Sequence, residues 1–385
     1  MGVLPAAATP VLATWDIFLF LPNIIIPVPT PFDGIEIRIC AGNDPILGSL
    51  SPAPANTTAQ QMLGAFRSQF GATYLPACLI VRTGAPATFR RQQTIRAFRN
   101  VCAVATIVTG YTGTQWHPRY SDHFDVYPLA PATGGGIVTN DAIVQGIHAA
   151  AGFMAQASPL IQKPTNFQCA PAQNFLTNLI LAWKHCFVFR RNRPALLPIF
   201  RSIDIALHAL RFPTDGLLGT QDAGLRIVLW VSAFETLLNP GAAIGGVDLR
   251  TVLQFLAGLP WKEKTLRRRA YKVADKRVKR LVTKAEAIYG DLYKARNDFI
   301  HGNKIQQKRL WFRESRQEQL LSQVAPLVYW ACLEEYLKLF FPGAQAAKPP
   351  AADISWLRTP AGRKYMVQRA AEWAQRGNAE AALAV

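Results

Sequence analysis

Residues 292–302 read Leu-Tyr-Lys-Ala-Arg-Asn-Asp-Phe-Ile-His-Gly. Apolar residues recur in steps of three and four through this stretch and the residues before it, which is the spacing of one helical stripe. The apolar positions of the stripe are 266, 270, 274, 278, 281, 285, 288, 292, 295 and 299. Gly302 is well placed to follow the helix in a left-handed conformation. The sequence therefore predicts a long amphipathic helix that begins near Leu266 and ends before this glycine.

The segments on both sides of this helix also predict helices. From Pro171 onward, apolar stripes are separated by Pro and Gly at positions where helices usually begin or end. The other predicted helices are residues 173–190, 193–211, 220–238, 248–259 and 314–341. We therefore expect an all-α bundle over residues 168–343, followed by an Ala/Pro linker and terminal helix over residues 344–385.

The first part of the chain has a different pattern. Short runs rich in Ile, Phe and Val lie between Pro, Asp and Gly, which is typical of strands. These predicted strands are residues 17–26, 35–39 and 74–81, and the predicted helices between and after them are 58–70 and 89–104. The expected fold class is therefore α+β, with a mixed N-terminal domain over residues 1–160, whose role the sequence leaves open, followed by the helical bundle.

The positive charge of the chain is concentrated in one segment. The whole chain has a net charge of +18, and residues 250–316 carry 19 Lys and Arg against 6 Asp and Glu, a net charge of +13. A local basic excess of this size indicates a polyanionic partner, with nucleic acid ahead of a membrane surface.

Several other classes of protein are not expected. The first 15 residues lack the basic and apolar regions of a secretory signal. The most apolar stretch, residues 17–32, is interrupted by four prolines and is too short to cross a bilayer as a helix. The six cysteines show no paired spacing, so buried thiols are expected. We expect a soluble cytoplasmic protein with no membrane contact, no cofactor and no bound metal.

Arg296, Asn297 and His301 form the constellation best suited to act on a phosphodiester. Asn297 and His301 are four residues apart and share a helix face, whereas Arg296 and His301 are about 140° apart. One helix therefore does not bring the Arg and the His fully together, and a second copy of the chain packed at the helix end would complete the set. Capping of carbonyl groups or support of a dimer interface is the structural alternative for both residues.

Residues 296–302 resemble the Arg-x4-His motif of HEPN domains. The earlier stretch Leu-Trp-Val-Ser-Ala-Phe-Glu-Thr-Leu-Leu, residues 229–238, is similar to a helix of the Apea-like HEPN branch, and the resemblance covers roughly residues 170–341. The basic insert at residues 265–284 departs from the family pattern. The resemblance implies a helical bundle that forms a homodimer. It also implies metal-independent RNA cleavage of the kind found in bacterial toxin–antitoxin and anti-phage systems, with an antitoxin or a phage-derived trigger as a further partner.

The resemblance also implies roles for individual residues. His301 would act as acid and base near neutral pH, and Arg296 would stabilise charge on the phosphorane. Asn297 would orient a phosphate or the partner's histidine, and cleavage would leave a 2′,3′-cyclic phosphate. The expected supporting residues are Glu235, as a buried acid that pairs with Arg296, Asp298 and Gly302. The residues expected to hold the RNA backbone are Arg267, Arg268, Arg269, Lys272, Lys276, Arg277, Lys279, Arg280, Lys284 and Lys294.

Three functions stay open on these grounds. The first is an endoribonuclease, the second is a non-catalytic RNA- or nucleotide-binding HEPN module, and the third is a purely structural dimerisation domain. Four aromatic residues near the basic segment could stack on bases, namely Tyr271, Tyr293, Trp311 and Phe312. Positions in the core or at its rim are the default expectation for them. The loop that carries His117 and His123 is expected to pack on the domain surface, with a metal site as the minor alternative.

Overall fold

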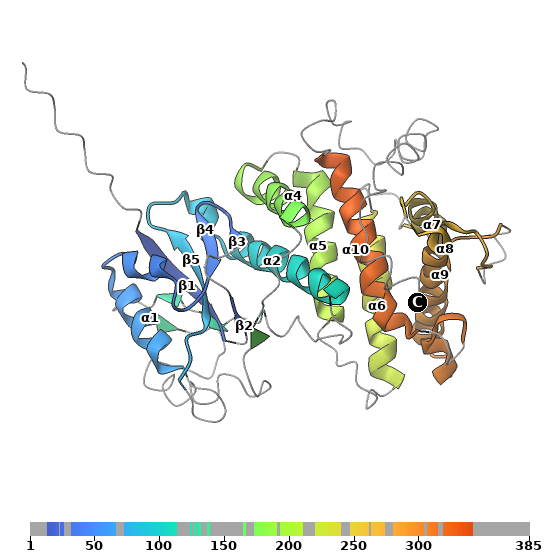
Figure 1. Ribbon diagram of the computed structural model, residues 1–385, viewed down its shortest axis with the longest axis horizontal. Coiled ribbons are helices and arrows are strands. Elements are labelled where there is room, and N and C mark those ends of the chain that lie inside the picture. Colours follow the sequence, from blue (N-terminus) through green and yellow to red (C-terminus); the bar gives the residue numbers. More distant parts are fainter. Residues whose placement is uncertain are drawn as a thin grey trace, which may run out of the picture. The chain divides into compact units, whose positions relative to one another are not determined.

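The structure is a computed structural model (Figure 1). It describes residues 14–22, 24–26, 32–66, 73–113, 124, 127–128, 130–131, 137–138, 165–166, 173–190, 193–210, 220–239, 247–261, 263–273, 280–303, 306–314 and 319–341. The chain is mixed α+β, with a small antiparallel sheet near the N-terminus and mostly helices beyond it. Its described residues divide into two compact units. The first contains the residues up to Gln92 and those from 124 to 166, and the second contains the rest.

The first unit is built on an antiparallel sheet with the strand order β3–β4–β5–β1–β6. The strands of this sheet are β1 (Trp15–Leu21), β3 (Phe32–Asp33), β4 (Ile37–Cys40), β5 (Ala77–Arg82) and β6 (Tyr127–Pro128). Two short pairs accompany it, namely β2 (Ile24–Ile25) with β9 (Thr165–Asn166), and β7 (Ala130–Pro131) with β8 (Ile137–Val138). The strands predicted at 35–39 and 74–81 are present with shifted ends, whereas the one predicted at 17–26 is divided into β1 and β2, which belong to different sheets.

The core of this unit lies between the sheet and α1 (Pro54–Ala65), which is labelled beside the strands in Figure 1. Phe20 of β1 packs edge-on against Phe66, with ring centroids 5.2 Å apart. Cys40 and Cys78 face each other across β4 and β5, and both are fully buried. Burial raises the pKa of the Cys40 thiol to about 12, so this group stays protonated at neutral pH.

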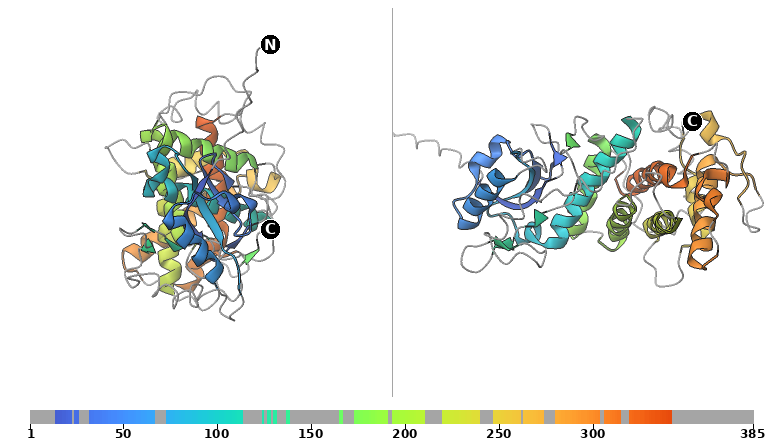
Figure 2. Two further views of the ribbon diagram at one scale, coloured as in Figure 1. Left: turned by 90° about the vertical axis from the view of Figure 1, so that its left-hand side faces the viewer. Right: turned by 90° about the horizontal axis from the view of Figure 1, so that it is seen from below.

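The second unit consists of helices packed around an apolar core. Its helices are α2 (Gln92–Gly113, from Gln93), α4 (Gln173–Trp183), α5 (Arg193–Ala209), α6 (Thr220–Leu237), α7 (Leu249–Ala257), α8 (Lys264–Arg267), α9 (Lys284–Ile300) and α10 (Leu321–Phe340). A π-helix, Lys184–Val188, continues α4, and the short 3-10 helices η5 (Gln307–Leu310) and η6 (Phe312–Glu314) lie between α9 and α10. Helix α6 contacts both α5 and α10, and the three helices can be followed in Figures 1 and 2.

Helix α2 packs with the helical unit, although the sequence analysis assigned it to the N-terminal domain. The indole N–H of Trp183 donates to the carbonyl oxygen of Thr94 over 2.9 Å, and the Trp183 ring lies 5.1 Å from that of Phe98. The guanidinium of Arg96 lies 2.8 Å from the carboxylate of Asp204 on α5. These contacts tie the first half of α2 to α4 and α5.

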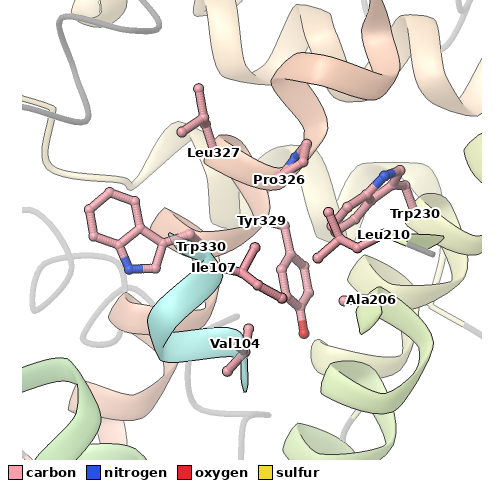
Figure 3. Close-up of a pocket in the computed structure, with 9 residues that line it drawn as sticks. All are labelled: Val104, Ile107, Ala206, Leu210, Trp230, Pro326, Leu327, Tyr329 and Trp330. Carbon is pink, nitrogen blue, oxygen red and sulfur yellow. The ribbon is translucent and has the colours of Figure 1, made fainter. Parts of the chain in front are cut away.

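A small apolar pocket lies where α2, α5, α6 and α10 meet (Figure 3). Its lining side chains are Val104, Ile107, Ala206, Leu210, Trp230, Pro326, Leu327, Tyr329 and Trp330. The Tyr329 hydroxyl, at the lower end of the Tyr329 ring in Figure 3, forms a hydrogen bond of 2.6 Å with the Ser202 hydroxyl. Because its lining is almost wholly apolar, this pocket offers no group for acid–base chemistry.

The long helix predicted from Leu266 to Phe299 is wrong between α8 and α9. Helix α8 ends at Arg267, and Tyr271 and Val282 form an antiparallel bridge in which each N–H donates to the other's carbonyl, over 3.2 and 2.9 Å. Helix α9 then begins with a capping box, because the Thr283 hydroxyl accepts from the Glu286 N–H and the Glu286 carboxylate accepts from the Thr283 N–H. The described residues between the two helices, 268–273 and 280–283, are not helical, so the apolar stripe does not follow one helix.

Five of the six cysteines lie in the described part of the chain, and all five are buried free thiols, as predicted. Across the described ranges, no helix has the length and apolar character needed to cross a membrane.

Candidate functional site

Helix α9, which carries the Arg296–His301 motif, packs against α6, α7 and α10. The start of α6 meets the end of α9, where the Phe299 ring lies directly over Gly224. Further along both helices, the rings of Phe234 and Tyr289 are 5.1 Å apart. These two contacts show that α6 and α9 run in opposite directions, so the motif lies near the start of α6.

Gly224→Ala is expected to destabilise the helical unit, because the added Cβ would clash with the Phe299 ring. Overpacking of this kind usually costs about 1–3 kcal/mol, against a gain in helix propensity of up to about 1 kcal/mol. Urea unfolding measures the net effect. Gly64→Ala is the matched control, since a Cβ at this position of α1 meets nothing within 4 Å, and it should be neutral or stabilising. Equal effects of both variants would contradict the close packing.

The end of α9 is a Schellman motif. Gly302 has a φ of +68° and donates its N–H to the Phe299 carbonyl over 3.2 Å, while the Asn303 N–H donates to the Asp298 carbonyl over 2.9 Å. The prediction that Gly302 ends the helix is confirmed. His301 is the C-cap residue, its backbone N–H donates to the Asn297 carbonyl, and its side chain is exposed. The described residues form no hydrogen bond with its imidazole ring.

The side chain of Arg296 is held between α6 and α9 and is 25% exposed. Its Nη2 lies 3.6 Å from Oε2 of Glu235 on α6, so the ion pair expected from the sequence is present. Its Nη1 donates to Oδ1 of Asn297 over 3.0 Å, and its Cζ lies 5.5 Å from the centre of the Tyr293 ring. Its Nε is buried and has no hydrogen-bond partner among the described residues.

Two acidic groups, the carboxyl of Glu235 and the hydroxyl of Tyr289, lie near this guanidinium. Burial raises the pKa of Glu235, and the positive charge of Arg296 offsets part of that rise. Burial also raises the pKa of the Tyr289 hydroxyl well above its usual range, with the nearby Glu235 carboxylate adding to the rise. The Tyr289 hydroxyl is buried and, within the described ranges, has no hydrogen-bond partner. The interior side of the motif is therefore polar and poorly solvated.

Glu235→Gln is expected to change how stability depends on pH. Because the folded-state pKa is raised, the wild-type carboxyl favours folding below its ordinary pKa of 4.5, and this contribution is lost as the pH rises through the folded-state value. Glutamine does not titrate. The unfolding free energy of the wild type minus that of the variant, as measured by urea unfolding, should therefore fall as the pH rises above 4.5. A difference that rises with pH would show that Arg296 outweighs burial.

Within one chain, Arg296 and His301 have different surroundings, as their angular separation predicted. Arg296 faces Glu235, whereas His301 is exposed at the helix end, and no hydrogen bond between the described residues joins the two side chains. Asp298 has a structural position, because its Oδ2 lies 3.4 Å from Nε of Arg309 and its Oδ1 accepts from the Asn303 amide. The chain thus supplies one Arg and one exposed His to this end of α9.

The basic residues predicted to hold RNA fall into three groups. Four are exposed on α8 and just after it, and they are Arg267, Arg268, Arg269 and Lys272. Three are tied into the protein: Arg280 pairs with the buried Glu286, Lys294 is half-buried, and Lys284 is buried with its Nζ 6.0 Å from the Phe312 ring. Lys284 is therefore not available to a phosphate, contrary to expectation. Lys276, Arg277 and Lys279 lie outside the described residues.

The exposed basic group lies at the opposite end of α9 from His301. Helix α8 contacts α9, which begins two residues after the Tyr271–Val282 bridge (Figure 1). Helix α9 has 17 residues, and at roughly 1.5 Å per residue it is about 25 Å long. The sequence places the basic residues and the motif in one segment, but a whole helix separates them in space.

Most of the aromatic residues near the basic segment lie in the core or at its rim. Phe312 is 1% exposed and lies 5.7 Å from the half-buried Tyr271 ring. Tyr293 packs against Arg296 and Tyr289, while Trp311 is half-buried. His117 and His123 lie outside the described residues. Within the described ranges, no group of three or more His, Cys, Asp and Glu side chains gathers in a way that could hold a metal ion.

Sequence reasoning gave no role to three basic residues that the structure brings next to α9, namely Lys308, Arg309 and Arg313. They lie in the stretch Gln-Gln-Lys-Arg-Leu-Trp-Phe-Arg, residues 306–313, which has three cationic side chains and no acidic one. The signal was present as a basic and aromatic run, but its position beside α9 depends on tertiary contacts.

Comparisons with protein-family models, curated proteins and solved structures find no match to this chain.

Proposed function

We propose that the helical unit is HEPN-like and that the chain is a metal-independent endoribonuclease of the bacterial defence or toxin type. The observation that carries the proposal is the position of His301. Its imidazole is exposed at a helix end, the fold makes no hydrogen bond with it among the described residues, and it follows Arg296 by five positions. Histidine combines donor and acceptor nitrogens with a charge change near neutral pH, as RNA cleavage requires.

In the proposed reaction, the 2′-hydroxyl oxygen of the substrate attacks the adjacent phosphorus, and the bond to the 5′-oxygen breaks. One His301 imidazole takes the 2′-hydroxyl proton, and a protonated His301 of a second copy gives a proton to the leaving 5′-oxygen. Arg296 stabilises the negative charge of the phosphorane, and Asn297 orients a phosphate oxygen or the partner's imidazole. The products are a 2′,3′-cyclic phosphate and a 5′-hydroxyl.

Two exposed apolar side chains next to the motif support a homodimer at this end of α9. Ile300 is 52% exposed and Leu225 is 40% exposed, and each is the immediate neighbour of one partner in the Phe299–Gly224 contact. Burial of such side chains against a second copy would remove apolar area from water. The same contact would bring two copies of His301 toward one another.

The test is cleavage of total RNA by the purified protein in EDTA. We expect fragments that end in a 2′,3′-cyclic phosphate, and we expect an otherwise identical oligonucleotide with one 2′-deoxy sugar to resist cleavage at that sugar. Loss of cleavage in Arg296→Ala, with unchanged thermal unfolding, would support its role in charge stabilisation. Absence of RNA cleavage by the wild type, with or without a trigger, would refute the nuclease proposal.

A non-catalytic RNA- or nucleotide-binding module is the second candidate function. The Glu235–Arg296 pair favours it, because a guanidinium that is already paired and three-quarters buried has less freedom to follow a reacting phosphate. RNA binding that is retained without any cleavage would support this reading. A stable dimer that binds no RNA at low salt would instead support a purely structural dimerisation domain. Such a domain would need neither an antitoxin nor a phage-derived trigger as a partner.

A further inference from the structure

We infer that a strip of cationic side chains runs along α9 from the basic group near α8 to the motif end, and that it binds a single strand of RNA several nucleotides long. The strip consists of Arg268, Arg269, Lys272, Arg313, Arg309 and Lys308. This inference rests on the proposed function for the reaction at the motif end, but its binding component is independent of cleavage.

The segment 306–313 forms the middle of the strip because it returns along one face of α9. Nε of Arg309 lies 3.4 Å from Oδ2 of Asp298, near the end of the helix. The backbone N–H of Arg313 donates to Oδ2 of Asp291 over 2.9 Å, and the ring of Phe312 lies under Nζ of Lys284 at the helix start. The three α9 residues are spaced by seven, which is two helical turns, so they share one face.

The same segment holds the basic group at the start of α9. Nη1 of Arg313 donates to the carbonyl oxygen of Lys272 over 2.8 Å, and its Cζ lies 5.6 Å from the centre of the Tyr271 ring. Tyr271 in turn packs on Phe312 and pairs with Val282 through two backbone hydrogen bonds. The exposed cations after α8 are therefore attached to the returning segment at a defined position rather than on a free chain.

The chemistry of the strip fits a phosphate backbone. Arg268, Arg269, Lys272, Lys308 and Arg313 are exposed, and Arg309 is 26% exposed. The side chain of Trp311, between the last two arginines, is half-buried and leaves part of its ring at the surface. Cations that follow a line, with an aromatic ring among them, are typical of single-stranded nucleic acid binding without sequence readout.

The length of the strip determines how many nucleotides of RNA are needed to occupy it. Helix α9 is about 25 Å long, and a stacked strand advances roughly 3.4 Å per nucleotide, so about eight nucleotides reach from one end to the other. A dinucleotide can occupy the motif but cannot reach the basic group. The expected substrate is therefore an unpaired RNA segment of this length or longer, rather than a free nucleotide or a short fragment.

The test compares a labelled dinucleotide with a labelled RNA of about twelve nucleotides, by fluorescence anisotropy in the full-length His301→Ala protein, where cleavage does not interfere. The Arg268→Ala/Arg269→Ala double variant should weaken binding of the longer RNA about tenfold. It should also reduce the magnitude of the slope of log K against log salt by roughly 0.7 per lost contact. The matched control is Arg91→Ala/Arg201→Ala, which removes two exposed arginines outside the strip and should have no effect.

Cleavage is then measured with His301 restored. In the Arg268→Ala/Arg269→Ala variant, kcat/KM for the longer RNA should fall about tenfold while kcat/KM for the dinucleotide is unchanged. Equal losses in the strip variant and the control variant would overturn the inference, as would equal binding of double-stranded and single-stranded RNA. If the wild type never cleaves but the strip variant alone loses affinity for the longer RNA, the strip stands and the proposed nuclease reaction fails.

Discussion

Replacement of His301 by alanine is expected to reduce the rate of RNA cleavage by about 10²- to 10⁴-fold, the usual contribution of a general acid or base. The fold should not change, because the helix end is closed by backbone N–H groups that alanine keeps, and the imidazole is exposed. The measurement is the single-turnover rate on an excess of protein over RNA, with thermal unfolding of both proteins as the stability check.

His208→Ala is the matched control for this experiment. His208 is also an exposed histidine, but it lies in the last turn of α5 rather than at the end of α9. Its replacement should leave the cleavage rate within about twofold of the wild type, since it contributes no acid–base group to the motif. A His301→Ala protein that cleaves as fast as the His208→Ala protein would exclude His301 from the reaction.

The second large effect is expected for Trp183→Ala, which should lower the unfolding free energy of the helical unit by about 3–5 kcal/mol, as for other buried large aromatic residues. Trp183 is fully buried, packs on Phe98 and donates its indole N–H to the Thr94 carbonyl. The substitution leaves a cavity between α2 and α4 and an acceptor without its donor. Urea unfolding followed by circular dichroism at the helix signal measures the loss.

Two further variants separate the contributions at this position. Trp183→Phe keeps most of the ring but removes the donor, so it should cost roughly 1–3 kcal/mol. Trp311→Ala, at a half-buried position between η5 and η6, should cost less than Trp183→Ala because less apolar area is lost. If Trp183→Ala is no more destabilising than Trp311→Ala, then α2 does not pack with the helical unit as described.

The sequence predicted most helices because each is closed by local signals. Pro194 near the start of α5, the Asn239 region after α6 and Gly302 after α9 all lie within three residues of the observed ends. Local chemistry of this kind acts within one turn and needs no information from distant parts of the chain. The strands of the first unit were found for the same reason, since short β-branched and aromatic runs are bounded by turn residues.

The wrong helix prediction at residues 268–273 and 280–283 has a specific cause. Leu266 on α8 and Ala285 and Ile288 on α9 are buried, but Ala270 is exposed and Leu281 is 47% exposed, so the apparent stripe joins the buried faces of two separate helices. The Thr283–Glu286 capping box is visible in the sequence as Thr-x-x-Glu, and it marks a helix start at α9 that counting apolar steps overlooks. Periodicity predicts which residues face inward, whereas capping residues show where one helix stops and another begins.

The candidate site also contains one part that the sequence predicts and one part that it does not. The Glu235–Arg296 pair could be predicted because an acid with apolar neighbours on its helix needs a cation, and the structure places the two 3.6 Å apart. The return of residues 306–313 along α9 could not be predicted, because it depends on contacts between Asp298 and Arg309 and between Asp291 and Arg313. Neither a surface ion pair, as in the first contact, nor a hydrogen bond from a backbone N–H to a carboxylate, as in the second, leaves a periodic pattern in the sequence.

The Tyr271–Val282 bridge has a consequence for how such a chain can change over evolutionary time. Tyr271 and Val282 are joined by a pair of backbone hydrogen bonds, so the two ends of the segment between them lie at nearly the same place. A segment whose ends meet can be shortened, lengthened or exchanged for another without refolding the elements on either side, because longer closed loops add little entropic penalty. The segment between Tyr271 and Val282 can therefore change in length or sequence while the helices on either side, α8 and α9, are retained.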